Sequence, residues 1–253
     1  MQRIIYVLIS YLSLIFTLPV FSSYSHSPLS YEQGVNALAE IHAQLNLLYG
    51  SLLDEYPEQL MAVRFIPPNA HVLELGGNIG RNSCVIAKIL DNSMNLVTLE
   101  SSPNIAKQLI ENRDRNGLNF FVEAAALSKV SLIQNEWLTI PGTVCPEGYF
   151  PVKTISFKEI QKKYAIEFDV LVADCEGALY QILKNDESFL KNIKLILVEN
   201  DYPYDPRVNK YKFTKKVFER NGYQLIYNEP GPPGACVIFP HTGDIFYQVW
   251  AKI

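Results

Sequence analysis

A short apolar strand that runs directly into a glycine-rich turn and a helix constrains this chain more than any other feature. The segment covers residues 72–80 and reads VLELGGNIG. Gly76, Gly77 and Gly80 allow positive φ and remove side chains where the main chain must approach a ligand, and the following helix offers unpaired N–H groups at its start. The segment predicts a nucleotide-binding corner, with a plain tight connection as the alternative.

The spacing of the glycines distinguishes between ligands. A dinucleotide-binding turn reads G-x-G-x-x-G, whereas this turn reads E-x-G-x-x-x-G and places the carboxylate of Glu74 at its mouth. Negative charge there suits a cationic ligand better than a pyrophosphate. S-adenosylmethionine carries a sulfonium and an ammonium group and no phosphate, so the turn favours methyl transfer. An NAD-dependent oxidoreductase is the alternative that this spacing opposes.

Length and charge limit the class of protein. The chain has 253 residues and a formal net charge of −4. This length allows one α/β domain with a substantial core and a short extension, but hardly two enzymatic domains. No long basic stripe occurs, so the electrostatic signature of a nucleic-acid-binding protein is missing. We therefore expect a small-molecule partner and no nucleic acid.

The N-terminus has the pattern of a targeting segment. Arg3 precedes an apolar run from Ile4 to Phe21, close to the roughly 20 residues that span a bilayer. Residues 1–22 are expected to be a cleaved signal peptide or an uncleaved membrane anchor. The expected location is the secretory pathway or a membrane, with association through residues 4–21. A buried helix and a cytoplasmic location are the alternative.

Apolar periodicity divides the remainder into two parts. Residues 31–49 have helical spacing and a second helix is expected after Pro57, so residues 23–66 are interpreted as a helical extension. In residues 67–253 short apolar strands alternate with helices, which predicts an α/β fold with a doubly wound, mostly parallel sheet. Its first five strands are expected at residues 71–75, 95–100, 119–124, 168–173 and 193–199.

Two regions depart from this alternation. Residues 125–150 contain two prolines and two glycines in their second half, and they predict an irregular excursion or a small hairpin. A capping box that starts at Ser156 predicts the next helix. The segments 223–228, 235–239 and 245–253 predict strands without helices between them, and hence an antiparallel closing edge.

Acidic residues follow several of the predicted strands. In a doubly wound sheet the first and fourth strands are neighbours where the strand order reverses, and ligands bind outside their carboxyl ends. Glu74 and Asp174 are therefore expected to share one crevice. Glu100 ends the second strand twenty residues beyond Gly80, where a carboxylate can accept hydrogen bonds from both ribose hydroxyls.

The chain resembles the FkbM-type family of S-adenosylmethionine-dependent methyltransferases in four motifs. These are residues 72–80 against a strand ending D-x-G-A-N-x-G, residues 100–103 (ESSP) against E-P-x-P, residues 124–128 (AAALS) after the third strand, and residues 174–178 (DCEGA) against D-x-E-G-A-E. Order and spacing agree from about His71 to Gly222. The resemblance implies a class I methyltransferase domain with a Rossmann-like, mostly parallel, seven-stranded sheet. It also implies O-methylation of a hydroxyl on a small molecule or a sugar. Leu179 replaces the family's usual glutamate, which favours the alternative of a catalytically drifted protein that only binds the donor.

The predicted donor site for the cofactor S-adenosylmethionine has three parts. The methionine end would be held by the turn, the ribose by the acid after the second strand, and the adenine edge by the end of the third strand. The residues assigned to these parts are, in order, Glu74, Gly76, Gly77, Asn78 and Gly80; Glu100; and Glu123 with Ala124.

The acceptor side is assigned to the fourth strand. Methyl transfer is an in-line displacement, so alignment of acceptor, carbon and sulfur can supply most of the acceleration. Asp174 is the best candidate for deprotonating a hydroxyl, with Glu176 either assisting or capping the next helix. This assignment uses no metal. A divalent ion that bridges Asp174 and Glu199 or Asn200 is a second possibility, because hard oxygen ligands suit magnesium.

Overall fold

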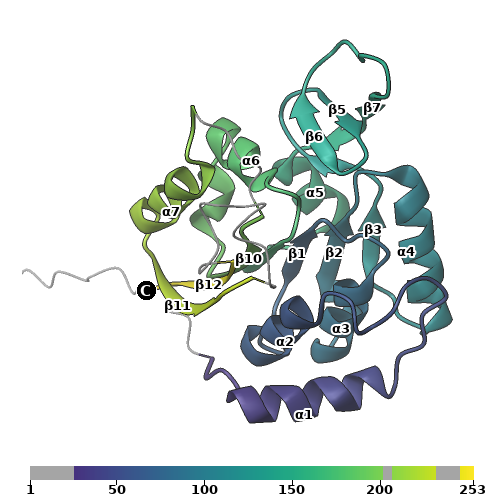
Figure 1. Cartoon of the computed structure of the whole chain (residues 1–253). Helices are drawn as coiled ribbons and strands as arrows, with labels where there is room; N and C mark the ends of the chain where they lie inside the picture. Colours follow the sequence, from purple (N-terminus) through teal and green to yellow (C-terminus); the bar gives the residue numbers. More distant parts are fainter. Residues whose placement is uncertain (1–25, 202–206, 232–245) are drawn as a thin grey trace, which may run out of the picture.

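A computed structural model of the protein describes residues 26–201, 207–231 and 246–253 (Figure 1). Within these residues a seven-stranded sheet has the order β11-β12-β10-β9-β1-β2-β3. The strands are β1 (Val72–Leu75), β2 (Leu96–Leu99), β3 (Phe121–Glu123), β9 (Val170–Ala173), β10 (Leu195–Glu199), β11 (Tyr223–Glu229) and β12 (Tyr247–Lys252).

The pairing of these strands confirms the predicted α/β, doubly wound, mostly parallel sheet. β1 pairs in parallel with β2 and β9, while β2 pairs in parallel with β3, and β9 with β10. β12 runs antiparallel to both β10 and β11, which is the predicted closing edge. The five predicted inner strands agree with the observed ones to within two residues at each end. The predicted strand at 235–239 lies outside the described residues.

Helices cover both faces of the sheet. The seven α-helices of the described residues are α1 (Tyr31–His42), α2 (Tyr56–Phe65), α3 (Arg81–Ile89), α4 (Pro103–Arg115), α5 (Phe157–Tyr164), α6 (Leu179–Asn185) and α7 (Lys210–Arg220). Two short 3-10 helices, η1 (Ser93–Asn95) and η2 (Ser188–Lys191), precede β2 and β10. One core contains side chains of α1, α2 and α3, and the other contains side chains of α5, α6 and α7.

Alternation along the strands divides the apolar side chains between these two cores. Val72 of β1 belongs to the core under α1–α3, whereas Leu73 belongs to the core under α5–α7. Both side chains are fully buried, and each such burial contributes roughly 1.5 to 3 kcal/mol. Because both faces are covered, the strands read as nearly continuous apolar runs, as the sequence does.

The region between β3 and α5 forms two small sheets. β5 (Leu132–Asn135) pairs antiparallel with β6 (Leu138–Pro141) and β7 (Phe150–Val152), and β4 (Ala126–Leu127) pairs with β8 (Thr154–Ile155). This confirms the predicted excursion or small hairpin, and Figure 1 shows β5, β6 and β7 above α5. The capping box at Ser156 is present, since the Glu159 carboxylate accepts a 2.8 Å hydrogen bond from the Ser156 N–H.

The N-terminal extension is helical, but its first helix is shorter than the periodic segment. α1 ends at His42, and the chain then leaves the helix, so Leu48 is 52% exposed. α2 has Pro57 in its first turn, where a missing N–H costs nothing. Side chains of α2 belong to the core that this helix shares with α1 and α3. The division between an extension and a domain at residues 66 and 67 stays a prediction.

The predicted secretory or membrane location is corrected by the structure. In residues 26–201, 207–231 and 246–253, no helix has the length and apolar character that a membrane crossing requires. The prediction of membrane association is therefore wrong for this part of the chain. The run from Ile4 to Phe21, on which the prediction rested, lies outside the described residues.

Asn112 of α4 attaches the extension to the rest of the protein. Its Oδ1 accepts hydrogen bonds from the N–H groups of Leu48 (2.6 Å) and Tyr49 (3.1 Å). Its Nδ2 donates to the carbonyl oxygens of Tyr49 (3.1 Å) and Ile79 (2.8 Å). The side chain is fully buried. The side-chain amide of Asn112 thus connects the segment before α2 to Ile79, near the end of the glycine-rich turn after β1.

We expect Asn112→Ala to destabilise the protein by about 2 to 4 kcal/mol, because it leaves buried backbone groups without partners at roughly 1 to 3 kcal/mol each. Urea unfolding would measure the loss. The matched control is Asn116→Ala at the C-cap of the same helix. Asn116 makes the equivalent pair of bonds to Asn46 at the surface, where water can replace them. An equal loss in both variants would contradict the assignment.

Candidate active site

A pocket of about 300 Å³ opens where the strand order of the main sheet reverses, between β1 and β9. Its walls come from the ends of β1, β2, β9 and β10, from the start of α2, and from the small sheet of β5 and β6. Ligands of doubly wound sheets bind at such a reversal, and this volume lies at the lower end of the range for small-molecule sites. We therefore take this pocket as the candidate active site.

The turn after β1 is built around a close approach of main chain to main chain. Gly76 has φ of +87°, and a Cβ there would lie 1.5 Å from the carbonyl oxygen of Asp174. The N–H of Gly76 donates to the carbonyl oxygen of Leu99 at 3.0 Å, and the N–H of Asp174 donates to that of Leu75. Only glycine fits, and its absent side chain brings the ends of β1, β2 and β9 together.

The remaining members of the turn divide into two groups. Asn78 lines the pocket, as Gly76 does. Gly77 and Gly80 do not line it. A Cβ on Gly77 would lie 2.2 Å from Cγ2 of Thr98, and Gly80, with φ of +91°, is the N-cap residue of α3. The structure therefore gives these two glycines a role in shaping the turn.

Glu100 lies at the end of β2 and faces the pocket with its carboxylate fixed from behind. Oε2 accepts a hydrogen bond from the N–H of Asn78 (2.9 Å), and Oε1 accepts one from the N–H of Ser102 (2.8 Å). Burial raises the pKa of Glu100, while these hydrogen bonds lower it. A carboxylate has about four acceptor positions, so capacity remains for ligand hydroxyls. The predicted contact to ribose is compatible with this placement.

Glu74 does not share the crevice as predicted. Its side chain points into the core, where it accepts hydrogen bonds from the hydroxyls of Ser83 (2.5 Å) and Thr98 (2.7 Å). It does not line the pocket, and burial raises its pKa to about 7 despite these bonds. The reason is strand alternation. Glu74 points to the same face of the sheet as Val72, and that face is covered by the core under α1–α3. The expected contact to the methionine end is corrected to a support of the turn from beneath.

The predicted adenine contacts at Glu123 and Ala124 also require correction, because neither residue lines the pocket. Glu123 is buried and bound by the ammonium groups of Lys153 (2.8 Å) and Lys163 and by the hydroxyl of Tyr164. Burial acts to raise its pKa, but these partners lower it to about 2. The pocket wall on this side is formed by the next two residues, Ala125 and Ala126.

Glu123→Gln should lower the free energy of unfolding at pH 7 by about 1 to 2 kcal/mol, less than the pKa shift alone implies because both lysines are half exposed. The folded pKa lies below the value of about 4.3 in an unfolded chain, so the stabilisation is complete above that pH. It is lost as the pH falls toward 2. Urea unfolding of both proteins between pH 7 and pH 3 should show curves that converge at low pH. Parallel curves would contradict this account.

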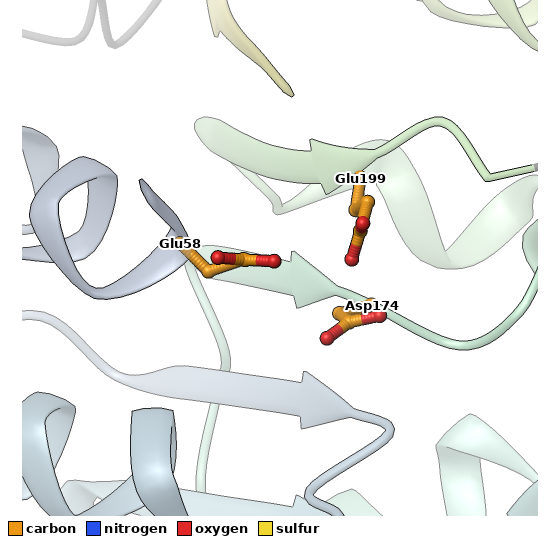
Figure 2. A group of neighbouring side chains, drawn as sticks. All are labelled: Glu58, Asp174 and Glu199. Atoms are coloured by element: carbon orange, nitrogen blue, oxygen red, sulfur yellow. The ribbon is translucent and has the colours of Figure 1, made fainter. Parts of the chain in front are cut away.

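Three carboxylates from separate elements meet at the floor of the pocket (Figure 2). They belong to Glu58 in the first turn of α2, Asp174 after β9, and Glu199 at the end of β10. One oxygen of each lies within 4.8 Å of the others. Asp174 and Glu199 were predicted to lie at this edge, but Glu58 was not. Acidic residues are common in first helical turns, so the sequence offers no signal that separates Glu58 from an ordinary one.

Burial disfavours ionisation of all three carboxylates. Together with the charges of neighbouring acids, it raises the pKa of Asp174 to about 7 and that of Glu58 to about 8. Burial and the charges of Asp174 and Glu58 raise the pKa of Glu199 further still. Such a group either shares protons or requires a cation.

Three other polar residues follow β9 and β10 but do not belong to the group of three carboxylates. The side-chain amide of Asn200 is buried and donates to the carbonyl oxygen of Phe246 (3.3 Å) and to Gln248 (3.2 Å). Asp201 accepts the N–H of Gly177 at 2.9 Å. Glu176 is exposed and lines the pocket, and α6 has Ala178 as its N-cap without a side-chain bond. The structure therefore does not support the capping alternative for Glu176.

The pocket carries a strong excess of negative charge. Its described lining contains no Lys, Arg or His, and it contains six acids: Glu55, Glu58, Glu100, Asp174, Glu176 and Glu199. Glu55 has a cationic partner behind the wall, since its Oε1 lies 2.6 Å from Nη1 of Arg81. The arrangement favours positively charged or neutral ligands over anions.

One comparison with curated proteins relates the chain to a methyltransferase. Hexuronic acid methyltransferase AglP of Haloferax volcanii is 26% identical over 140 residues, which are 53% of this chain and 57% of the relative. The chain thus matches little more than half of the length of that protein. No protein-family model matches the sequence, so the resemblance to FkbM-type methyltransferases stays a prediction.

Solved structures with low sequence identity are similar over most of the chain. An O-methyltransferase from Bacillus cereus in complex with S-adenosylhomocysteine is 18% identical, with a TM-score of 0.47, over 88% of this chain and 90% of that one. A protein of the NADB-Rossmann superfamily from Streptococcus agalactiae is 12% identical, with a TM-score of 0.49, over 81% and 70%. The α/β assignment itself is established by the strand order given above.

Proposed function

We propose that the protein is an S-adenosylmethionine-dependent methyltransferase that acts on a hydroxyl of a small molecule or a sugar. The observation that carries the proposal is the meeting of the Gly76 turn and Glu100 in one acid-lined pocket at the reversal of strand order. The sulfonium and ammonium groups of the donor suit this charge, whereas the pyrophosphate of NAD does not. The match to a curated methyltransferase supports the same class.

The donor would lie along the ends of β1 and β2. In this proposal Gly76 and Asn78 contact the methionine end, Glu100 accepts hydrogen bonds from the ribose hydroxyls, and the wall at Ala125 and Ala126 contacts the adenine. The D-x-E-G-A element at residues 174–178 supports an FkbM-type protein within the class. In this proposal the methyl group faces Asp174.

The acceptor would enter beside the hairpin of β5 and β6. Trp137 lines the pocket there and is 52% exposed, so its indole offers a flat apolar surface to a ring such as a sugar. An acidic sugar would add another carboxylate to a wall that already has six. We therefore propose a neutral acceptor and do not extend the hexuronic acid of the relative to this chain.

A donor-binding protein without transferase activity is the second candidate. Leu179 favours it, because a core side chain that is 1% exposed stands where the FkbM-type family has glutamate. Leu179 packs under the pocket and contributes no polar group to it. Binding of the donor without transfer to any acceptor would support this candidate.

We expect Glu100→Ala to weaken binding of S-adenosylhomocysteine about 10- to 100-fold, because one or two charge-assisted hydrogen bonds of roughly 1.5 to 3 kcal/mol are lost and water compensates in part. Isothermal titration calorimetry would measure the affinity, with NAD as the comparison ligand. Glu123→Gln is the matched control and should bind normally, because Glu123 does not line the pocket. Preference of the wild-type protein for NAD would remove the proposed function.

Asp174→Asn should leave donor affinity within about threefold of the wild type, while transfer of a labelled methyl group to the acceptor falls roughly 100-fold or more. The reason is that Asn keeps the size of the side chain but cannot accept the hydroxyl proton. A panel of neutral sugars and other hydroxyl compounds would serve as acceptors. Loss of donor binding with normal turnover of bound donor would instead assign Asp174 to the donor site.

A further inference from the structure

Three acids at the floor of the pocket have a defined mutual geometry in addition to their negative charge. Glu58, Asp174 and Glu199 come from α2, from the turn after β9 and from the end of β10, and Figure 2 shows their carboxylates facing one another. One oxygen of each lies within 4.8 Å of the other two. The main sheet fixes two of them, and the extension adds the third.

Glu58 supplies an independent indication that something binds between these groups. The residue is only 6% exposed, and its Oε2 is fully buried without a hydrogen-bond partner. A buried carboxylate oxygen is rarely left in this state, because it loses its hydration, and the interactions of the Glu58 side chain with Glu199 and Tyr247 do not reach Oε2. Since the described lining of the pocket has no Lys, Arg or His, a protein cation does not fill this role.

We propose that Glu58, Asp174 and Glu199 bind a divalent cation of the oxygen-seeking class, such as Ca²⁺ or Mg²⁺. Two oxygens on one ion can be no farther apart than twice the metal–oxygen distance, which is about 4.2 Å for Mg²⁺ and about 4.6 to 5.2 Å for Ca²⁺. Three oxygens at a mutual spacing of 4.8 Å lie about 2.8 Å from their common centre, so small side-chain shifts bring them to the Ca²⁺–oxygen distance of about 2.3 to 2.6 Å. Mg²⁺ requires larger shifts, and both ions complete their shells with water.

The ion suggested by the sequence bridges Asp174 and either Glu199 or Asn200. Asn200 is unsuitable because its amide is directed toward Phe246 and Gln248. The proposed site keeps Asp174 and Glu199 and adds Glu58, so a bound ion would join the extension to the ends of β9 and β10. The proposal stands on the geometry of the three carboxylates and does not depend on the proposed methyl transfer.

Titration calorimetry of chelator-treated full-length protein with CaCl₂, MgCl₂ and MnCl₂ tests the site. We expect saturable binding of at least one of these ions with a dissociation constant at or below about 1 mM, and a rise in melting temperature when the ion is added. Glu58→Gln should weaken binding at least about 10-fold, because affinity follows the number of charged ligands. The same variant should lose the ion-dependent rise in melting temperature.

Glu176→Gln is the matched control, because it removes a carboxylate from the same pocket but outside the three. Its affinity for the ion should stay within about threefold of the wild type, since an exposed charge is screened by water. If circular dichroism shows that Glu58→Gln is unfolded, Asp174→Asn replaces it with the same expected loss. The proposal is overturned if none of the three ions binds below about 10 mM, or if the ligand variant binds as tightly as the wild type.

The same preparations separate this inference from the proposed function. Binding of S-adenosylhomocysteine without binding of any ion would overturn the cation site and leave the methyltransferase proposal intact. Binding of the ion without binding of S-adenosylhomocysteine would support the cation site and overturn the methyltransferase proposal. Enzymatic activity is not the readout, because Asp174 also has the acceptor-side role proposed above.

Discussion

The close approach of Gly76 to the carbonyl oxygen of Asp174 is the constraint on which the site depends. A side chain at position 76 would meet that oxygen at 1.5 Å, so β1 and β9 could not end side by side. Their neighbours β2 and β10 end at the same edge, and each brings an acid to it. A backbone contact therefore sets the positions of Glu100, Asp174 and Glu199, and it does so before any ligand is present.

That arrangement concentrates negative charge in a partly buried space. Most buried acids of the described structure have a partner, as Glu123 has in two lysines and Glu74 in two hydroxyls. The group formed by Glu58, Asp174 and Glu199 has no cationic partner among the described residues of the pocket wall. The presence or absence of a partner separates acids that stabilise the fold from acids that are available to ligands.

The extension contributes to the site as well as to the core. Asn112 fixes the chain that leads into α2, and α2 then presents Glu55 and Glu58 to a pocket otherwise built from strand ends. The position of these two acids relative to the sheet therefore depends on one buried amide and on the packing of α2, a helix that is buried over most of its length. A loss of that docking would change the charge of the pocket without altering the strands.

The sequence alone determined the α/β class, the strand positions, the closing edge and the placement of the residues after β1, β2 and β9 at one end of the sheet, because strand periodicity and glycine spacing are local properties. It misplaced Glu74 and Glu123 among the ligand contacts, since the face to which a strand residue points, and the lysines that reach it, depend on neighbouring elements. Glu58 was missed because it is about 116 residues from Asp174 in the chain, and only the packing of α2 on the sheet brings the two carboxylates together. Short segments of sequence determine strands and turns, whereas tertiary structure determines which distant charged residues come together.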